Sequence, residues 1–257
     1  MDKYFGDISL KVCTRKQGWF QKSKALYPWI RSIQIEGQAP VILNPDGIVD
    51  VFIDPLDGSL NYLKDPHGKL FQHGFVCTMV FAKKNPLFCD IVGALIVNMS
   101  QQHWAYAVSL NGEYIFRTKG RNVPICALGH EWNPGQNLHI WEAYYPQMRA
   151  FIAWATENKY LGKGWFRNPG SAACEMLAVS TGIAASMVCD RQKMHELGAG
   201  WLLVKANCGV GLNLETGKDL DETSYNFSAQ VPMALAATPT IAEGWVKLYQ
   251  EFKSQDA

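Results

Sequence analysis

Short apolar runs dominate the first half of the chain. Four of them are rich in β-branched and aromatic residues and are bounded by Pro, Gly, Asn or Lys: residues 49–53 (VDVFI), 75–82 (FVCTMVFA), 91–97 (IVGALIV) and 103–108 (HWAYAV). Runs of this length and composition are typical of β-strands. The turn-forming pairs Asn85-Pro86 and Asn111-Gly112 lie between or just after them. The pattern predicts a mainly β lobe over residues 1–125.

Helix and strand signals alternate in the second half. Apolar residues recur at helical spacing in two segments, 171–181 (Ala172, Met176, Val179) and 197–206 (Leu197, Trp201, Val204). Residues 184–189 and 209–214 are strand-like. This alternation predicts an α/β lobe over residues 126–257, joined to the first lobe in one compact unit. The segment 125–169 has little periodicity, and there we predict only the connection between the lobes.

Length and charge narrow the class of protein. A chain of 257 residues can bury one large core or two smaller ones. Lys plus Arg number 24 and Asp plus Glu 23, so the chain lacks the single-sign field of a nucleic-acid or membrane-surface binder. The N-terminal sequence is charged where a signal peptide is apolar, and no stretch approaches ~18 apolar residues. We expect a cytoplasmic protein with a small-molecule substrate, and neither a nucleic-acid nor a membrane partner.

The cysteines indicate reduced thiols. There are seven, an odd number, scattered singly through or beside apolar stretches. The sequence has no C-x-x-C pair, which removes the usual signature of a structural zinc site or a redox pair.

The acidic string DPLDGSLNY covers residues 54–62, directly after the apolar run VDVFI. Asp54 and Asp57 are three positions apart on a turn that contains proline and glycine, so both carboxylates can point to one side of a strand end. Mg²⁺ usually takes one or two carboxylates together with water and phosphate oxygens. Free N–H groups at Gly58 and Ser59 would suit a phosphate. A plain surface turn is the alternative interpretation, because Asp, Pro and Gly are the commonest turn residues.

The longer string DPLDGSxN after an apolar strand resembles the first signature of the inositol monophosphatase superfamily, which also includes fructose-1,6-bisphosphatases and bisphosphate nucleotidases. Residues 195–209, HELGAGWLLVKANCG, resemble its second signature. By that match Glu196 takes the place of an aspartate that ligates a second metal and touches a substrate hydroxyl. His195 takes the place of a tryptophan, and we expect a structural or supporting role for it. The alternative for Glu196 is a charge favoured by the helix dipole.

Two further segments are similar to the same family. GSAA at residues 170–173 resembles a segment whose backbone approaches the sugar or inositol ring, although Ser171 is equally compatible with a plain helix N-cap. Glu36, in SIQIEGQ, lies eighteen positions before Asp54. A family glutamate at about that distance shares the first metal, whereas a lone surface glutamate is the alternative interpretation.

The resemblance implies a layered αβαβα sandwich of the sugar phosphatase type (α/β, or α+β) whose N-terminal helical part is shortened, because residues 11–17 (KVCTRKQ) offer no acidic residue. It also implies two or more Mg²⁺ ions. Asp54 would bridge them, Glu36 and the Leu56 carbonyl would complete the first site, and Asp57 with Glu196 would hold the second. The expected catalytic residues are Glu36, Asp54 and Ser59, the last orienting the attacking water. The expected substrate-binding residues are Gly58, Ser59, Gly170, Ser171, Ala172, Asp190 and Glu196.

The activity implied by the resemblance is hydrolysis of a phosphate monoester of inositol or a related sugar, with lithium sensitivity and a homodimeric state. Fructose-1,6-bisphosphatase and 3′-phosphoadenosine 5′-phosphate nucleotidase activities are the alternatives within the enzyme class. A non-catalytic relative that serves as a binding or regulatory module is the alternative outside it.

Overall fold

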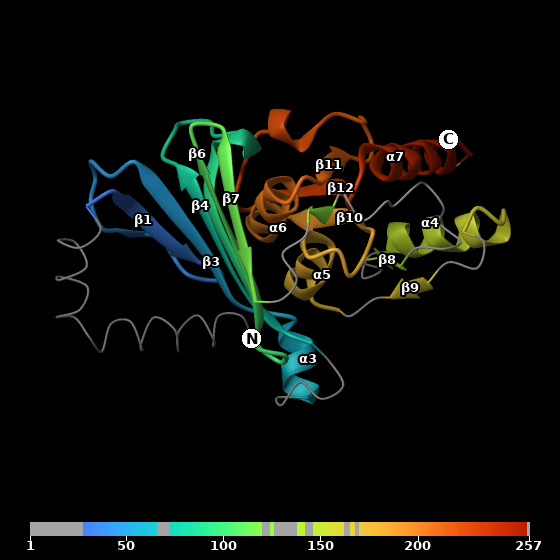
Figure 1. Ribbon diagram of the computed structural model, residues 1–257, viewed down its shortest axis with the longest axis horizontal. Helices are drawn as coiled ribbons and strands as arrows, with labels where there is room; N and C mark the ends of the chain where they lie inside the picture. The colour runs from blue at the N-terminus through green and yellow to red at the C-terminus, as the bar shows by residue number, and fades with distance from the viewer. Residues whose placement is uncertain are drawn as a thin grey trace.

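Sheets and helices alternate in layers along the molecule (Figure 1). The computed structural model describes residues 28–65, 72–119, 124–125, 138–141, 146–161, 165–167 and 170–255. A seven-stranded sheet is followed by helices α5 (Ala172–Ser180) and α6 (Met194–Ala206), then by a five-stranded sheet, and then by α4 (Pro146–Glu157) and α7 (Pro239–Gln255). The predicted layered α/β class is therefore confirmed. The predicted shortening of the N-terminal helical part concerns residues before Pro28, which lie outside the described residues.

The seven-stranded sheet has the order β2-β1-β3-β4-β5-β6-β7. Its strands are β1 (Ile30–Ile35), β2 (Val41–Ile42), β3 (Val49–Asp57), β4 (Gly74–Phe81), β5 (Ile91–Asn98), β6 (His103–Leu110) and β7 (Glu113–Thr118). The four predicted strands are confirmed as β3 to β6. Asn111 and Gly112, both with positive φ, form the two-residue loop between β6 and β7. β1 was not predicted, because Arg31, Ser32 and Gln34 interrupt its apolar pattern.

The five-stranded sheet has the order β11-β12-β10-β8-β9. Its strands are β8 (Leu138–Trp141), β9 (Trp165–Arg167), β10 (Ser186–Lys193), β11 (Val210–Asn213) and β12 (Gln230–Ala236). The predicted strands at 184–189 and 209–214 are confirmed as β10 and β11. The prediction that 125–169 holds only a connection was wrong, since β8, α4 and β9 lie there. The boundary between the lobes at residue 125 stays a prediction.

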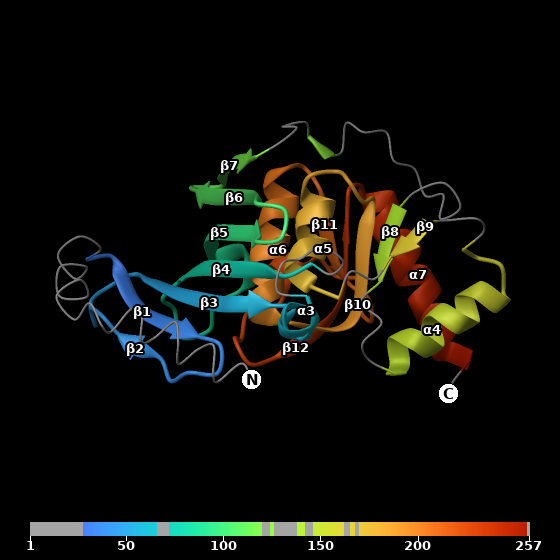
Figure 2. The ribbon, with the colours of Figure 1, turned by 90° about the horizontal axis from the view of Figure 1, so that it is seen from below.

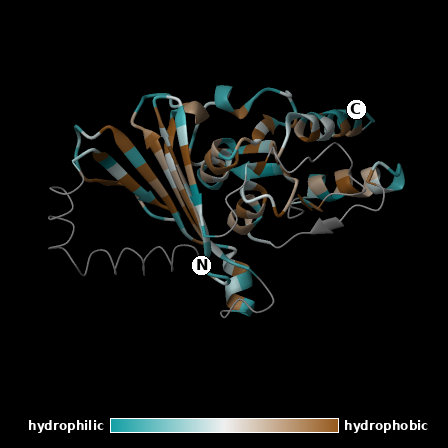
Figure 3. Cartoon of the chain, in the orientation of Figure 1, coloured by the Kyte–Doolittle hydropathy of each residue, from teal (hydrophilic) through white to brown (hydrophobic). Residues whose placement is uncertain are grey.

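The main core lies between the two sheets. Side chains of α5 and α6 pack against the inner face of the seven-stranded sheet on one side and against β10 and β12 on the other. α6 is buried almost all round, as expected for a helix enclosed by two sheets. Along β10, Met187 and Cys189 face this core, whereas Val188 faces α4 and α7. Hydrophobic and hydrophilic positions alternate in the same way along the strands in Figure 3.

A second core holds α4 and α7 on the outer face of the five-stranded sheet. α4 buries Met148, Phe151 and Ala155, which recur at helical spacing, while its remaining residues are exposed or half-buried. That narrow apolar stripe explains why the sequence pattern did not reveal the helix. In the part of the chain that the structure describes, no helix is long and apolar enough to cross a bilayer.

Candidate metal centre

Two parallel strand ends bring the first acidic side chains together. β1 and β3 run parallel, with Ile35 opposite Ile53 (Figure 2). Glu36 directly follows β1, and its N–H donates to the Ile53 carbonyl over 2.8 Å. The residue after Ile53 is Asp54, so the two carboxylates lie side by side although eighteen positions separate them. The structure thus brings Glu36 and Asp54 together, as the sequence predicted.

The acidic string is a bulged strand end rather than the turn that we predicted. β3 continues to Asp57, and its pairing with β4 shifts register between Asp54 and Asp57. The Leu56 N–H donates to Asp54 Oδ1 over 2.9 Å, which stabilises the bulge and buries the Leu56 side chain. Bulges re-aim side chains at strand ends. Both carboxylates are consequently buried, with Asp54 4% and Asp57 9% exposed.

Gly58 ends the bulge and starts a short helix, α3 (Ser59–Lys64). Its φ of 78° is in the left-handed region, which favours glycine. A Cβ at this position would lie 3.0 Å from the Ser171 Cβ and 3.1 Å from the Gln72 carbonyl oxygen. The segments around Gly58 and Ser171, 113 positions apart in sequence, are therefore in contact.

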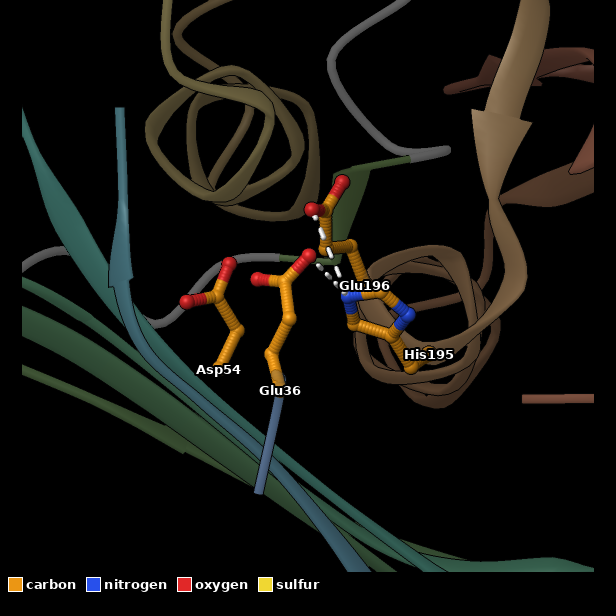
Figure 4. A group of neighbouring side chains, drawn as sticks. All are labelled: Glu36, Asp54, His195 and Glu196. Atoms are coloured by element: carbon orange, nitrogen blue, oxygen red, sulfur yellow. Dashed lines mark ion pairs between the residues drawn. The ribbon is translucent and has the colours of Figure 1, made fainter. Parts of the chain in front are cut away.

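The first turn of α6 brings His195 and Glu196 to the same place. The Thr78 hydroxyl of β4 donates to the His195 carbonyl over 2.8 Å and fixes this end of the helix on the sheet. Ligand atoms of Glu36, Asp54, His195 and Glu196 all lie within 4.8 Å of one another (Figure 4). Glu196 is 4% exposed. In Figure 4 one carboxylate oxygen of Glu36 points toward Asp54 and the other toward His195.

His195 is held in the cluster by contacts on both sides of its ring, and its expected supporting role stays a prediction. Its ring stacks on Phe227 and its Nδ1 lies 3.2 Å from the Phe227 carbonyl oxygen. A carbonyl oxygen accepts a hydrogen bond, so Nδ1 carries a proton, and Nε2 faces the carboxylates, 3.6 Å from Glu36 Oε1 and 3.5 Å from Glu196 Oε1. Metal-binding histidines are held in the same way, by a hydrogen bond from the other ring nitrogen. A histidine in place of a tryptophan gave no such signal in the sequence.

The crowded carboxylates perturb one another. Burial, together with the charges of Asp57, Glu196 and Glu36, raises the pKa of Asp54 well above its usual range. Burial also acts to raise the pKa of Glu36, but hydrogen bonding with His195 and the charge of Lys193 outweigh it and lower that pKa to about 2. For His195 burial acts downward, yet hydrogen bonding to Glu196 and Glu36 raises its pKa to about 10. Without a cation, ionisation of Asp54 is therefore disfavoured, whereas the charge of Glu36 is compensated by its neighbours.

Asp57 points toward the predicted substrate segment. Its Oδ2 accepts hydrogen bonds from the Ser171 hydroxyl over 2.6 Å and from the Ala173 N–H over 2.7 Å. Ser171 is also the N-cap of α5, since its hydroxyl accepts from the Cys174 N–H. The helix N-terminus favours this carboxylate. Gly170 and Ala172 flank Ser171, so the GSAA segment lies beside the second aspartate.

Asp190 lies away from this cluster. It shares a face of β10 with Val188, on the side of α4 and α7, where Met148 and Tyr249 lie nearby. Burial raises the pKa of Asp190. The pairing of β10 with β12 shifts register between Cys189 and Gln192. After this shift Gln192 contacts Glu196, and the structure does not bring Asp190 to the other predicted residues.

The donor set fits a divalent cation. Three carboxylates and one imidazole nitrogen converge, and the raised pKa of Asp54 reflects negative charge that a cation would neutralise. The carboxylate oxygens suit Mg²⁺, Mn²⁺ or Ca²⁺, whereas the imidazole would bind a metal only after Nε2 lost its proton. Such an ion next to the N-termini of α3 and α5 would make a place for an anionic group.

Solved structures share this fold. The chain is similar to an IMPase/NADP phosphatase complexed with Mg²⁺ and phosphate (TM-score 0.63, 12% identity, 91% of this chain and 79% of that chain). It is also similar to the extragenic suppressor protein suhB from Bartonella henselae (0.64, 17%, 90% and 80%) and to an IMPase from Thermotoga maritima (0.64, 17%, 92% and 80%). No protein-family model and no curated protein matches the sequence. The chain therefore has the inositol monophosphatase fold.

Proposed function

We propose that this protein is a Mg²⁺-dependent phosphoric monoester hydrolase of the inositol monophosphatase type, acting on a phosphate of inositol or a related sugar. The observation that carries the proposal is the convergence of Glu36, Asp54, His195 and Glu196 at one end of the larger sheet. The shared fold supports it, since one structure with this fold is an IMPase/NADP phosphatase complexed with Mg²⁺ and phosphate and another has inositol monophosphate bound.

The residues divide the work of hydrolysis. Asp54, Glu36 and the Leu56 carbonyl would hold the first divalent ion, and Asp57 and Glu196 are the candidates for a second. When bound, such ions stabilise the charge that develops on the phosphoryl group and lower the pKa of a bound water. Ser59 and Glu36 orient the attacking water. The N–H groups of Gly58 and Ser59 hold phosphoryl oxygens, because donors fixed in place stabilise developing charge without reorganisation.

The alcohol part of the substrate lies against the GSAA segment. Gly170, Ser171 and Ala172 line this side, and Asn61 holds the segment to α3 by donating to the Gly170 carbonyl over 3.0 Å. Glu196 can accept from a substrate hydroxyl. We also propose that the protein is a cytoplasmic, lithium-sensitive homodimer, for which light scattering and lithium titration are the tests.

A substrate panel tests the proposal. Phosphate release is measured from inositol-1-phosphate, fructose-1,6-bisphosphate and 3′-phosphoadenosine 5′-phosphate, with and without Mg²⁺ and Li⁺. We expect Mg²⁺-dependent release that is fastest from inositol-1-phosphate and is suppressed by Li⁺. Fastest release from either other compound would assign that substrate class instead. No release from any of them would favour the non-catalytic module.

Replacing Gly58 with Ala is expected to lower kcat by roughly 10²-fold, because a shift of about 1 Å in a positioned group can cost that much. The new Cβ would press on Ser171 and Gln72 and displace Ser59. Gly112→Ala is the matched control, since Gly112 also has a positive φ (83°) but a Cβ there meets nothing within 4 Å. Equal kcat in the two variants would contradict the role of Gly58.

A further inference from the structure

Lys193 reaches into the carboxylate cluster from the end of β10. Its Nζ lies 2.7 Å from Glu36 Oε1 and 3.6 Å from Glu196 Oε1. The backbone of Lys193 is paired with Gln230 in β12, so the strand fixes where the side chain starts. An ammonium group thus lies between two of the carboxylates predicted to bind metal. Resting on the proposed function, we infer that Lys193 takes the place of the second divalent ion and that this protein works with one ion per chain.

The hydrogen bonds of Glu196 support this assignment. Its Oε2 accepts from the Gln192 side-chain amide, and its Oε1 faces both Lys193 Nζ and His195 Nε2. Gln192 is itself buried. Groups of the chain therefore already face both carboxylate oxygens of Glu196. A divalent ion at this carboxylate would have to displace a buried amide and an ammonium.

Asp57, the other residue predicted to hold the second ion, is engaged as well. Ser171 and Ala173 both donate to its Oδ2, which ties that oxygen to the N-terminus of α5. The first site differs. Among the described residues, the Leu56 N–H donates to Asp54 Oδ1 and Lys193 Nζ donates to Glu36 Oε1. The other carboxylate oxygens, Asp54 Oδ2 and Glu36 Oε2, are left for a ligand. Carboxylate oxygens are thus available for one ion at Asp54 and Glu36. At Glu196, and at Oδ2 of Asp57, they are already bound by groups of the protein.

Charge leads to the same division. Lys193 supplies one positive charge to a cluster of four carboxylates, Glu36, Asp54, Asp57 and Glu196. A doubly charged ion at Glu196 would lie beside the Lys193 ammonium, and like charges at that separation repel. An ion at Asp54 and Glu36 would instead meet the two carboxylate oxygens, Asp54 Oδ2 and Glu36 Oε2, that the hydrogen bonds of the described residues leave open. One ion at Asp54, with Lys193 at Glu196, is the arrangement with the least repulsion.

Counting bound ions tests the inference. Mg²⁺ stoichiometry is measured by titration calorimetry on the full chain, and Mn²⁺ serves as the probe for electron paramagnetic resonance. We expect one Mg²⁺ per wild-type chain and the spectrum of an isolated Mn²⁺. In Lys193→Met, which keeps the length of the side chain but removes its charge, we expect two ions and a spin-coupled Mn²⁺ pair.

Lys83→Met is the matched control. Lys83 is paired with Asp90 over 2.5 Å and follows β4 at the end remote from the cluster, since β4 begins at Gly74 opposite Asp57. This variant is expected to bind one ion.

Two ions in the wild type, or one ion in a folded Lys193→Met, would overturn the inference. Two ions with Mg²⁺-dependent phosphate release would leave the proposed function standing, whereas no ion and no release would remove both.

Discussion

Asp54→Asn is expected to abolish Mg²⁺-dependent phosphate release, with a loss of at least about 10³-fold in kcat/KM. A bound ion supplies several kcal/mol of transition-state stabilisation, and each 1.36 kcal/mol is tenfold in rate. Asn keeps the shape of Asp and can still accept the hydrogen bond from the Leu56 N–H. The variant therefore removes the charge that holds the ion while preserving the bulge.

The stability of Asp54→Asn separates a metal effect from misfolding. Without Mg²⁺, the Asp54 carboxylate is crowded by Asp57, Glu196 and Glu36, which is why its pKa is raised. Removing the charge is therefore expected to leave the melting temperature unchanged or higher. Mg²⁺ should raise the melting temperature of the wild type, because ligands that bind only the folded state stabilise it. It should not raise that of the variant. Retained activity, or a melting temperature well below the wild type, would contradict the assignment of Asp54.

The sequence predicted those parts of the fold in which local pattern and burial agree. Most residues of β4 and β5 are buried or half-buried, so each strand forms an apolar run that is evident in the sequence. α7 escaped prediction although it is the longest helix described, with buried residues at Ile241, Trp245, Leu248 and Phe252. Ala242, Val246 and Tyr249 are buried beside them, so the apolar face of α7 is broad and recurs at helical spacing. The pattern of this helix was therefore present in the sequence, and the prediction missed it.

The candidate site was predictable where a contiguous string encoded it. Asp54 and Asp57 belong to one motif, and a parallel strand pair places Glu36 beside them. Lys193 could not be predicted, because a lysine that precedes a helix is usually solvated, and its position depends on pairing with Gln230. Asp190 shows the converse. Its place near the second motif suggested substrate binding, but the two-residue alternation of β10 turns it to the opposite face from Cys189.

The second sheet supports the site through α7, and Trp245 is the centre of that support. Its indole is fully buried, stands edge-on to the rings of His139, Trp141 and Phe151, and donates to the Ser186 hydroxyl over 2.8 Å. Ser186 begins β10, the strand that ends at Lys193. Packing around Trp245 therefore holds in place the strand that delivers Gln192 and Lys193 to the carboxylates.

Trp245→Ala is expected to lower the free energy of unfolding by about 3–5 kcal/mol, through lost burial and the cavity that remains. Trp245→Phe should cost less, because it keeps most of the ring packing and removes only the donor to Ser186, which His139 still contacts over 2.7 Å. Urea unfolding followed by circular dichroism measures both. Trp154→Ala is the matched control, as Trp154 is half-buried on α4, and it should cost less than Trp245→Ala. If Trp154→Ala were the more destabilising change, Trp245 would not be the centre of the support of the second sheet.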